Sequence, residues 1–224
     1  MNTITSIRPT SGFATTRRGR RLSIAGAAYV GAWISGLVLA PATPAATAPA
    51  TEVHAYYAEN GASILLQSSL IHGIAGIALA VMALTLPAAT GTTGRLANLV
   101  RGFGVAAAIV SFAQVALAVV AVSTAPSVPA STSDQLFDAL NYADTIKLML
   151  LAVFTGGTTM AANRAGMLRG WMRPLTTALV VALPVGGVAF VVTNAALTAV
   201  LYVSLPLLLV WAGATAWQVG RHAL

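Results

Sequence analysis

Six long apolar stretches, separated by short polar segments, limit what this chain can fold into more than any other feature. A helix needs about 20 consecutive apolar residues to cross the hydrocarbon core of a bilayer. Each stretch approaches that length, so we predict an all-α membrane protein, a bundle of six transmembrane helices forming one domain over residues 22–220. The predicted spans are 22–40, 62–86, 102–122, 145–162, 175–192 and 195–219.

The charge content agrees with a surface that mostly faces lipid. Only 8% of the residues are charged, whereas a soluble domain carries about 25%. A net charge of +7 would favour nucleic acid as a partner of a soluble protein. Here the basic residues lie between apolar spans, so we expect contact with the lipid bilayer and not with nucleic acid. The chain has no cysteine, which excludes disulfides and thiol chemistry.

Basic and acidic residues fall on opposite sides of a six-span chain. All eleven arginines lie before the first span, after the sixth, or in the second-to-third and fourth-to-fifth connections. All five acidic residues lie on the other side, together with Lys147. Because Lys and Arg accumulate in cytoplasmic loops, we predict that both termini are cytoplasmic. The acidic residues are Glu52, Glu59, Asp134, Asp138 and Asp144.

The N-terminal region allows two interpretations. Residues 1–21 are rich in Ser, Thr and Arg and predict a disordered basic tail. Arg17–Arg21, the apolar stretch and the Pro/Ala/Thr-rich residues after it are also typical of a signal peptide cleaved within residues 1–49. The apolar run of about 19 residues is longer than a signal core of about 7–15, which favours a retained first span. We expect residues 41–61 to form an outer loop.

Small residues recur at every fourth position in the first two spans. Such a pattern lets helix backbones approach closely. It predicts packing within one bundle or, alternatively, the face of a homodimer or of a contact with another membrane protein. The residues are Ala28, Ala32, Gly36 and Ala40 in the first span, and Ser68, His72, Gly76 and Ala80 in the second.

Two polar residues stand at membrane depth, where polar groups are costly and often functional. His72 lies ten residues into the second span, or about 15 Å deep at 1.5 Å per residue. Gln114 lies in the middle of the third span, at a depth that allows a hydrogen bond to His72. A structural hydrogen bond between helices, a proton relay and a ligand contact all fit this pair.

A second polar series precedes the fourth span. Ser131–Asp134 has the spacing of a capping box and predicts a helix start. Asn141, Asp144 and Lys147 then follow at three-residue steps on one helix face, and Asp144 and Lys147 can form an i,i+3 ion pair. One interpretation is a solvated face whose lysine reaches lipid headgroups. The other is that this face and His72 share one outward-opening polar cavity with Gln114.

We find no constellation that indicates catalysis. One histidine at membrane depth is too few for a haem between helices, no acidic pair lies at the midplane, and no H-E-x-x-H zinc motif occurs. We therefore name no catalytic residue, metal site or cofactor, and predict an interaction or sensing module and not an enzyme. The alternative is a small transporter or permease subunit in which His72 is a protonatable group.

The order of several motifs resembles a known group of proteins. These motifs are Ala55-Tyr-Tyr57, Gln67-Ser-Ser-Leu-Ile-His72, Leu136-Phe-Asp-Ala-Leu-Asn141 with Asp144-Thr-Ile-Lys147, and the closing Tyr202-Val-Ser-Leu-Pro206. Over residues 55–220 the chain resembles uncharacterised actinobacterial multi-pass membrane proteins of unknown function. The resemblance implies a six-helix domain in a bacterial plasma membrane and no particular activity.

Overall fold

The protein is a bundle of long helices, and the computed structural model describes residues 12–192 and 194–223, with no strand among them. Its long elements are α1 (Gly12–Val38), α2 (Ala50–Ser68), α3 (Ala75–Ala89), α4 (Gly94–Thr124), α5 (Ala130–Arg164), α6 (Met172–Val188) and α7 (Ala195–His222). A π-helix, η1 (Ser69–Ile74), joins α2 to α3, and a 3₁₀ turn, η2 (Ala125–Ser127), follows α4.

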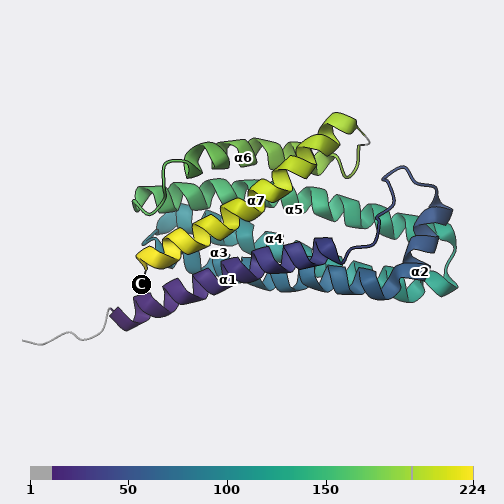
Figure 1. Cartoon of the computed structure of the whole chain (residues 1–224), viewed down its shortest axis with the longest axis horizontal. Helices are drawn as coiled ribbons and strands as arrows, with labels where there is room; N and C mark the ends of the chain where they lie inside the picture. Colours follow the sequence, from purple (N-terminus) through teal and green to yellow (C-terminus); the bar gives the residue numbers. More distant parts are fainter. Residues whose placement is uncertain (1–11, 193, 224) are drawn as a thin grey trace, which may run out of the picture.

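Six helices form a closed ring in chain order. α3 packs on α1 and α4, α5 packs on α4 and α6, and α7 closes the ring between α6 and α1. The ring encloses a core of Leu, Ala and aromatic side chains, in which Phe154 and Trp211 meet edge to face at 5.8 Å. The start of α1 and the end of α7 lie at the same end of the bundle (Figure 1).

Five helical segments are long and apolar enough to span a membrane, which indicates a transmembrane protein. They are Arg17–Val38, Ala50–Ala89, Gly94–Ser127, Ala130–Arg164 and Ala195–His222. The remaining predicted span, 175–192, corresponds to α6, a shorter apolar helix of 17 residues. The prediction of an all-helical membrane fold is therefore confirmed, whereas the full six-span crossing goes beyond what helix length and composition show.

Two predictions of non-helical structure were wrong. Residues 50–60, expected in an outer loop, form the first part of α2, which bends at Asn60 (φ −110°, ψ 16°) and lies across one end of the bundle (Figure 1). They fold because Val53 and Tyr57, one turn apart, bury against Phe137 of α5 in a second, smaller hydrophobic core.

The second of these predictions concerns the basic tail, which we expected to be disordered. Residues 1–11 lie outside the described residues, but the rest of the predicted disordered segment belongs to α1. The helix continues past its apolar part because arginine is a good helix former and its side chains extend into water. Leu22 and Gly19 at this end are buried, and the backbone of Gly19 lies close to Gly220 of α7.

The start of α5 also forms differently from our prediction. The helix begins at Ala130, Pro129 is its N-cap, and no side chain caps it, so the capping box of Ser131 and Asp134 does not form. Pro129 already fixes an extended backbone before the first turn (φ −62°, ψ 152°). Ser133 instead bonds the imidazole of His54, whose Nδ1 lies 3.0 Å from the hydroxyl oxygen, and so ties α5 to α2.

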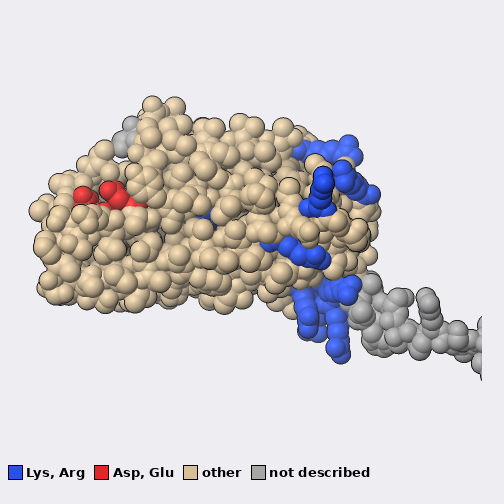
Figure 2. Space-filling view, turned by 180° about the vertical axis from the view of Figure 1, so that it is seen from behind, with Lys and Arg blue, Asp and Glu red and all other residues tan. Residues whose placement is uncertain are grey.

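Opposite charges occupy opposite ends of the bundle. Figure 2 shows most basic side chains gathered at one end and acidic side chains at the other, with a wide belt between them that is tan except for a small blue patch. The basic end is made by the start of α1, the start of α4, the end of α5, the start of α6 and the end of α7. Lys147 is the basic residue that does not follow this pattern, because it lies inside the bundle.

Candidate functional site

Four of the five predicted site residues meet around the ammonium group of Lys147. Its Nζ lies 2.6 Å from Asp144 Oδ1, 2.7 Å from Gln114 Oε1 and 3.1 Å from His72 Nδ1. The predicted ion pair between Asp144 and Lys147 is therefore present. We call these four residues the Lys147 cluster.

Three different elements bring the cluster together. Asp144 and Lys147 lie one turn apart on α5, Gln114 comes from α4 and His72 from η1. A fourth element, α1, covers the ammonium with the Trp33 ring, whose centroid lies 5.8 Å from Nζ. Cations are attracted to the face of an indole, and this contact had no signal in the sequence.

The ammonium group of Lys147 determines which groups of the cluster donate hydrogen bonds and which accept them. An ammonium has three N–H donors and no acceptor, and here three acceptors surround it. His72 must therefore accept at Nδ1, which places its proton on Nε2 and leaves the imidazole neutral. With Lys147 positive and Asp144 negative, the cluster has no net charge, and a neutral group is what a site surrounded by lipid tolerates best.

The cluster is packed and not an open cavity. Lys147 is 2% exposed and Gln114 is fully buried, so the predicted outward-opening cavity is replaced by direct contact. Asp144 is the more accessible member, with a side chain that is 20% exposed. A direct hydrogen bond between His72 and Gln114 was one of the alternatives that fit this pair, and here both side chains bond Lys147 instead.

Lys147 points inward because α5 places it on the buried face. The neighbouring Leu148 and Leu151 of that face lie in the main core, and the exposed side of the same helix carries Ile146 and Met149. A lysine on the exposed side could have extended toward lipid headgroups. On the buried side, the carboxylate one turn earlier and the amide of Gln114 are its partners.

Two buried polar atoms beside the cluster remain without hydrogen-bond partners among the described residues. They are Nε2 of Gln114 and the hydroxyl oxygen of Ser68, which precedes His72 by about one turn. An unpartnered buried polar group costs about 1–3 kcal/mol, so each calls for an explanation.

The π-helix sets the position of His72. The amide of Ala75 donates to the carbonyl of Leu70, five residues earlier, which is the π-helical pattern. One extra residue in a turn rotates the side chains that follow, and such turns are frequent at functional sites. We predicted an unbroken second span, and neither Pro nor an unusual spacing signals this change at residues 69–74.

Other predicted polar residues do not join the cluster. Asn141 lies one turn before Asp144, and its backbone carbonyl accepts from the hydroxyl of Thr145 at 3.1 Å. The Thr145 hydroxyl also lies 2.8 Å from the carbonyl oxygen of Gly187 and so links α5 to α6. Tyr202 is 71% exposed on the outer face of α7.

The small-residue series of the first two spans pack within the chain. A Cβ on Gly36 would meet the side chain of Ile71, and one on Gly76 would lie 3.2 Å from Cβ of Ser111. Ala32 is buried as well. These contacts favour the bundle interpretation, while a homodimer stays a prediction. Among the described residues, no group of three or more His, Asp or Glu side chains is arranged to hold a metal ion.

Comparison with protein-family models, with curated proteins and with solved structures gives no match. The resemblance to actinobacterial membrane proteins gains no support from these comparisons. The class of the protein therefore follows from its fold, which is that of an all-helical membrane protein with a buried ion pair.

Proposed function

We propose that this protein is a proton-responsive sensing module of a bacterial plasma membrane, with six spans and both termini in the cytoplasm. The single observation that carries the proposal is the contact of Lys147 with Asp144 and His72 inside the bundle. Ionisable groups within membrane helices are rare, and they mark functional sites by default.

The chemistry of the response follows from the hydrogen bonds. A proton gained at His72 Nδ1 removes an acceptor of Lys147 and places a second positive charge beside it. A buried cluster with no net charge thereby acquires one, and an uncompensated buried charge is costly. Proton uptake is therefore linked to a rearrangement that exposes the cluster or separates its members.

The rearrangement has a route to the outer surface. α5 contains neither Pro nor Gly between its first residue and Thr155, so the part that carries Lys147 continues without a break into the part that packs on α2. On the other side of this α2–α5 contact, α2 continues directly into η1, which carries His72. A shift between α5 and η1 would thus change the packing of the helices at the acidic end.

The topology is part of the proposal. The opposite charges of the two ends fit the positive-inside rule, which assigns the arginine-rich end to the cytoplasm (Figure 2). α6 is about 25 Å long at 1.5 Å per residue, slightly less than the hydrocarbon thickness of about 30 Å. A local thinning of the bilayer accommodates such a difference at modest cost.

Reporter fusions test this topology. Fusions at residues 92 and 224 should report a cytoplasmic location and a fusion at residue 128 an extracytoplasmic one. An extracytoplasmic signal at 92 or 224 would overturn the six-span arrangement, and so would a cytoplasmic signal at 128.

Cysteine accessibility tests the proton response, because the chain has no cysteine of its own. Ser68→Cys places a thiol at a buried position next to the cluster, and Ala58→Cys places one on the exposed part of α2. A water-soluble thiol reagent labels each variant in nanodiscs. The labelling rate of Ser68→Cys, divided by that of Ala58→Cys, should rise at least about tenfold on acidification. This ratio removes the pH dependence that the two thiols share, and the part that depends on the cluster is read from the comparison with His72→Gln.

His72→Gln should abolish this rise, because glutamine keeps an acceptor for Lys147 but gains no proton. His54→Gln is the matched control, since His54 also joins α5 to α2 but lies outside the cluster. A constant ratio in the protein with the native His72, or a rise that survives His72→Gln, would refute the proposal.

The second candidate function is proton-linked transport, and the π-helical turn at His72 favours it. Such turns are frequent at functional sites, and η1 places His72 in one within an otherwise continuous helix. Proteoliposomes that contain a pH-sensitive dye distinguish the two functions. Dissipation of a proton gradient by the wild type, but not by His72→Gln, would establish transport in place of sensing.

A further inference from the structure

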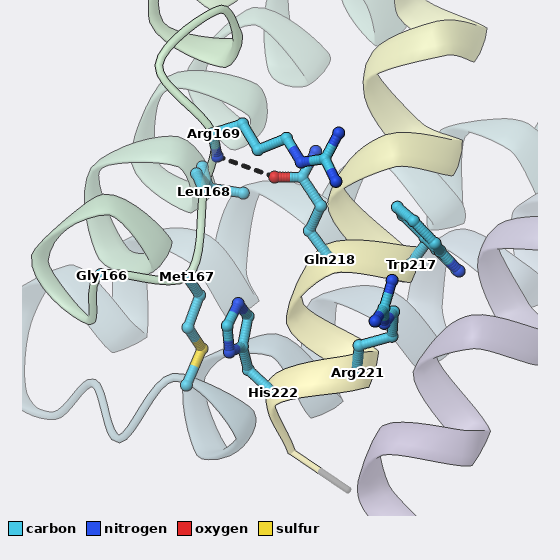
Figure 3. Close-up of a pocket in the computed structure, with 8 residues that line it drawn as sticks. All are labelled: Gly166, Met167, Leu168, Arg169, Trp217, Gln218, Arg221 and His222. Carbon is cyan, nitrogen blue, oxygen red and sulfur yellow. Dashed lines mark hydrogen bonds between the residues drawn. The ribbon is translucent and has the colours of Figure 1, made fainter.

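A pocket of about 360 Å³ lies at the basic end, far along the bundle from the Lys147 cluster. It opens between the connection that follows α5 and the last turns of α7 (Figure 3). Polar and cationic side chains line much of it: Arg169, Trp217, Gln218, Arg221 and His222. None of these residues belongs to the sensing mechanism proposed above.

The walls of the pocket are held in place by backbone geometry. The α5 C-terminus is closed by two amide donors, from Gly166 to the carbonyl of Asn163 at 3.0 Å and from Met167 to that of Ala162 at 3.0 Å. This arrangement needs a left-handed residue after the helix, and Gly166 has φ +69°. The connection that follows is therefore fixed and not a loose linker.

A side chain of α7 anchors the same connection. The backbone amide of Arg169 donates to Oε1 of Gln218 at 2.8 Å, and Gln218 is 6% exposed (Figure 3). The pocket is thus formed before any ligand arrives, which lowers the cost of binding.

Two arginines lie beside one indole ring in this pocket. The guanidinium carbons of Arg169 and Arg221 lie 6.0 Å and 4.8 Å from the centroid of Trp217. Both side chains are exposed, and the described residues contain no ion pair other than Asp144–Lys147. Guanidinium groups match the oxygens of phosphate groups and bind them through paired hydrogen bonds.

The surroundings indicate where the phosphate comes from. Val203, Val210 and Trp217 recur at seven-residue steps on α7 and are all about half exposed, so an apolar stripe runs along the helix and ends at the pocket. Exposed tryptophan is typical of the level of lipid headgroups. Acyl chains that follow the stripe would bring a headgroup to Arg169 and Arg221.

We propose that this pocket binds the phosphate of an anionic phospholipid, with Arg169 and Arg221 as its ligands and Trp217 beside the glycerol region. The site is specific, in contrast to the diffuse attraction that every arginine at this end exerts on an anionic bilayer. Basic pockets between membrane helices are suited to this kind of headgroup recognition.

Native mass spectrometry of the full chain tests the site, with phosphatidylglycerol and phosphatidylcholine as the probe lipids. The wild type should bind phosphatidylglycerol at least about tenfold more strongly than phosphatidylcholine. Arg169→Gln with Arg221→Gln should weaken this binding about 30-fold. The matched control is Arg17→Gln with Arg95→Gln, which removes the same charge at the same end and should weaken it less than about threefold.

Each remaining outcome counts against the site. Equal loss in the two double variants would show diffuse attraction only, and no loss in the pocket variant would remove the site. Displacement of phosphatidylglycerol by millimolar inorganic phosphate would reassign the pocket to soluble phosphate. Thermal unfolding of both variants within a few degrees of the wild type shows that the comparison concerns folded protein.

Discussion

Removing the carboxylate that faces Lys147 should destabilise the protein more than removing both charges of the Asp144–Lys147 ion pair. Lys147 is 2% exposed and has one charged partner, so Asp144→Asn leaves a buried ammonium among neutral acceptors. Breaking a buried pair costs about 3–5 kcal/mol. Asp144 is 20% exposed, which admits some water, and we therefore expect about 3 kcal/mol for this variant.

The reverse variant and the double variant complete the cycle. Lys147→Met leaves a carboxylate that can still reach water, at about 2 kcal/mol, and the double variant removes both charges, also at about 2 kcal/mol. The two single costs add to about 5 kcal/mol, so the coupling energy is about 3 kcal/mol, the upper range for residues in contact.

Reversible unfolding in mixed detergent micelles measures these differences. Asp138→Asn serves as the control, because this aspartate lies on the same helix but is exposed and outside the cluster, and it should cost less than about 0.5 kcal/mol. If the cost of the double variant equals the sum of the two single costs within about 0.5 kcal/mol, the two residues are not coupled, which would contradict a buried ion pair.

Three smaller predictions use the same unfolding assay or a local probe. Gln114→Leu removes an acceptor 2.7 Å from the ammonium and should cost about 1–3 kcal/mol; a neutral result would mean that the amide is not needed. Gly104→Ala should cost about 1–3 kcal/mol, because a Cβ there would lie 2.5 Å from Cβ of Ala83. Gly102→Ala on the same helix has open space and should be neutral or slightly stabilising. Ser133→Ala removes the bond to His54 and should increase hydrogen exchange over residues 50–60, with a global cost of about 1 kcal/mol.

The sequence predicted the helices better than it predicted where they end. Hydropathy marks the part of a helix that lipid surrounds, and not the polar turns that continue beyond it. Residues 50–60 of α2 and the arginine-rich start of α1 are helical for reasons other than lipid contact, namely the second core and helix propensity. The bend at Asn60 depends on how Tyr57 packs, which no local pattern contains.

The members of the Lys147 cluster could be found from the sequence because polar residues at membrane depth are few. The Asp144–Lys147 pair followed from its i,i+3 spacing. The contacts between helices could not be predicted, since they depend on how α4, α5 and η1 are rotated toward each other. For this reason the bond of His72 to Gln114 and the inward direction of Lys147 each stayed one of several open alternatives. Trp33 and the π-helical turn were missed because neither an apolar tryptophan nor residues 69–74 differ from an ordinary span.

One helix connects all three features of the molecule. α5 contacts α2 at its start, carries Asp144 and Lys147 near its middle, and ends at the turn whose Gly166 borders the basic pocket. Any axial or rotational shift of α5 that follows proton uptake must therefore be accommodated at the pocket as well. By thermodynamic linkage, a phospholipid that binds one arrangement of α5 more tightly changes the proton affinity of the cluster by the same factor. The proposed lipid site and the proposed proton site would thus be two inputs to one continuous helix, and their combined effect would reach the surface at the helices of the acidic end.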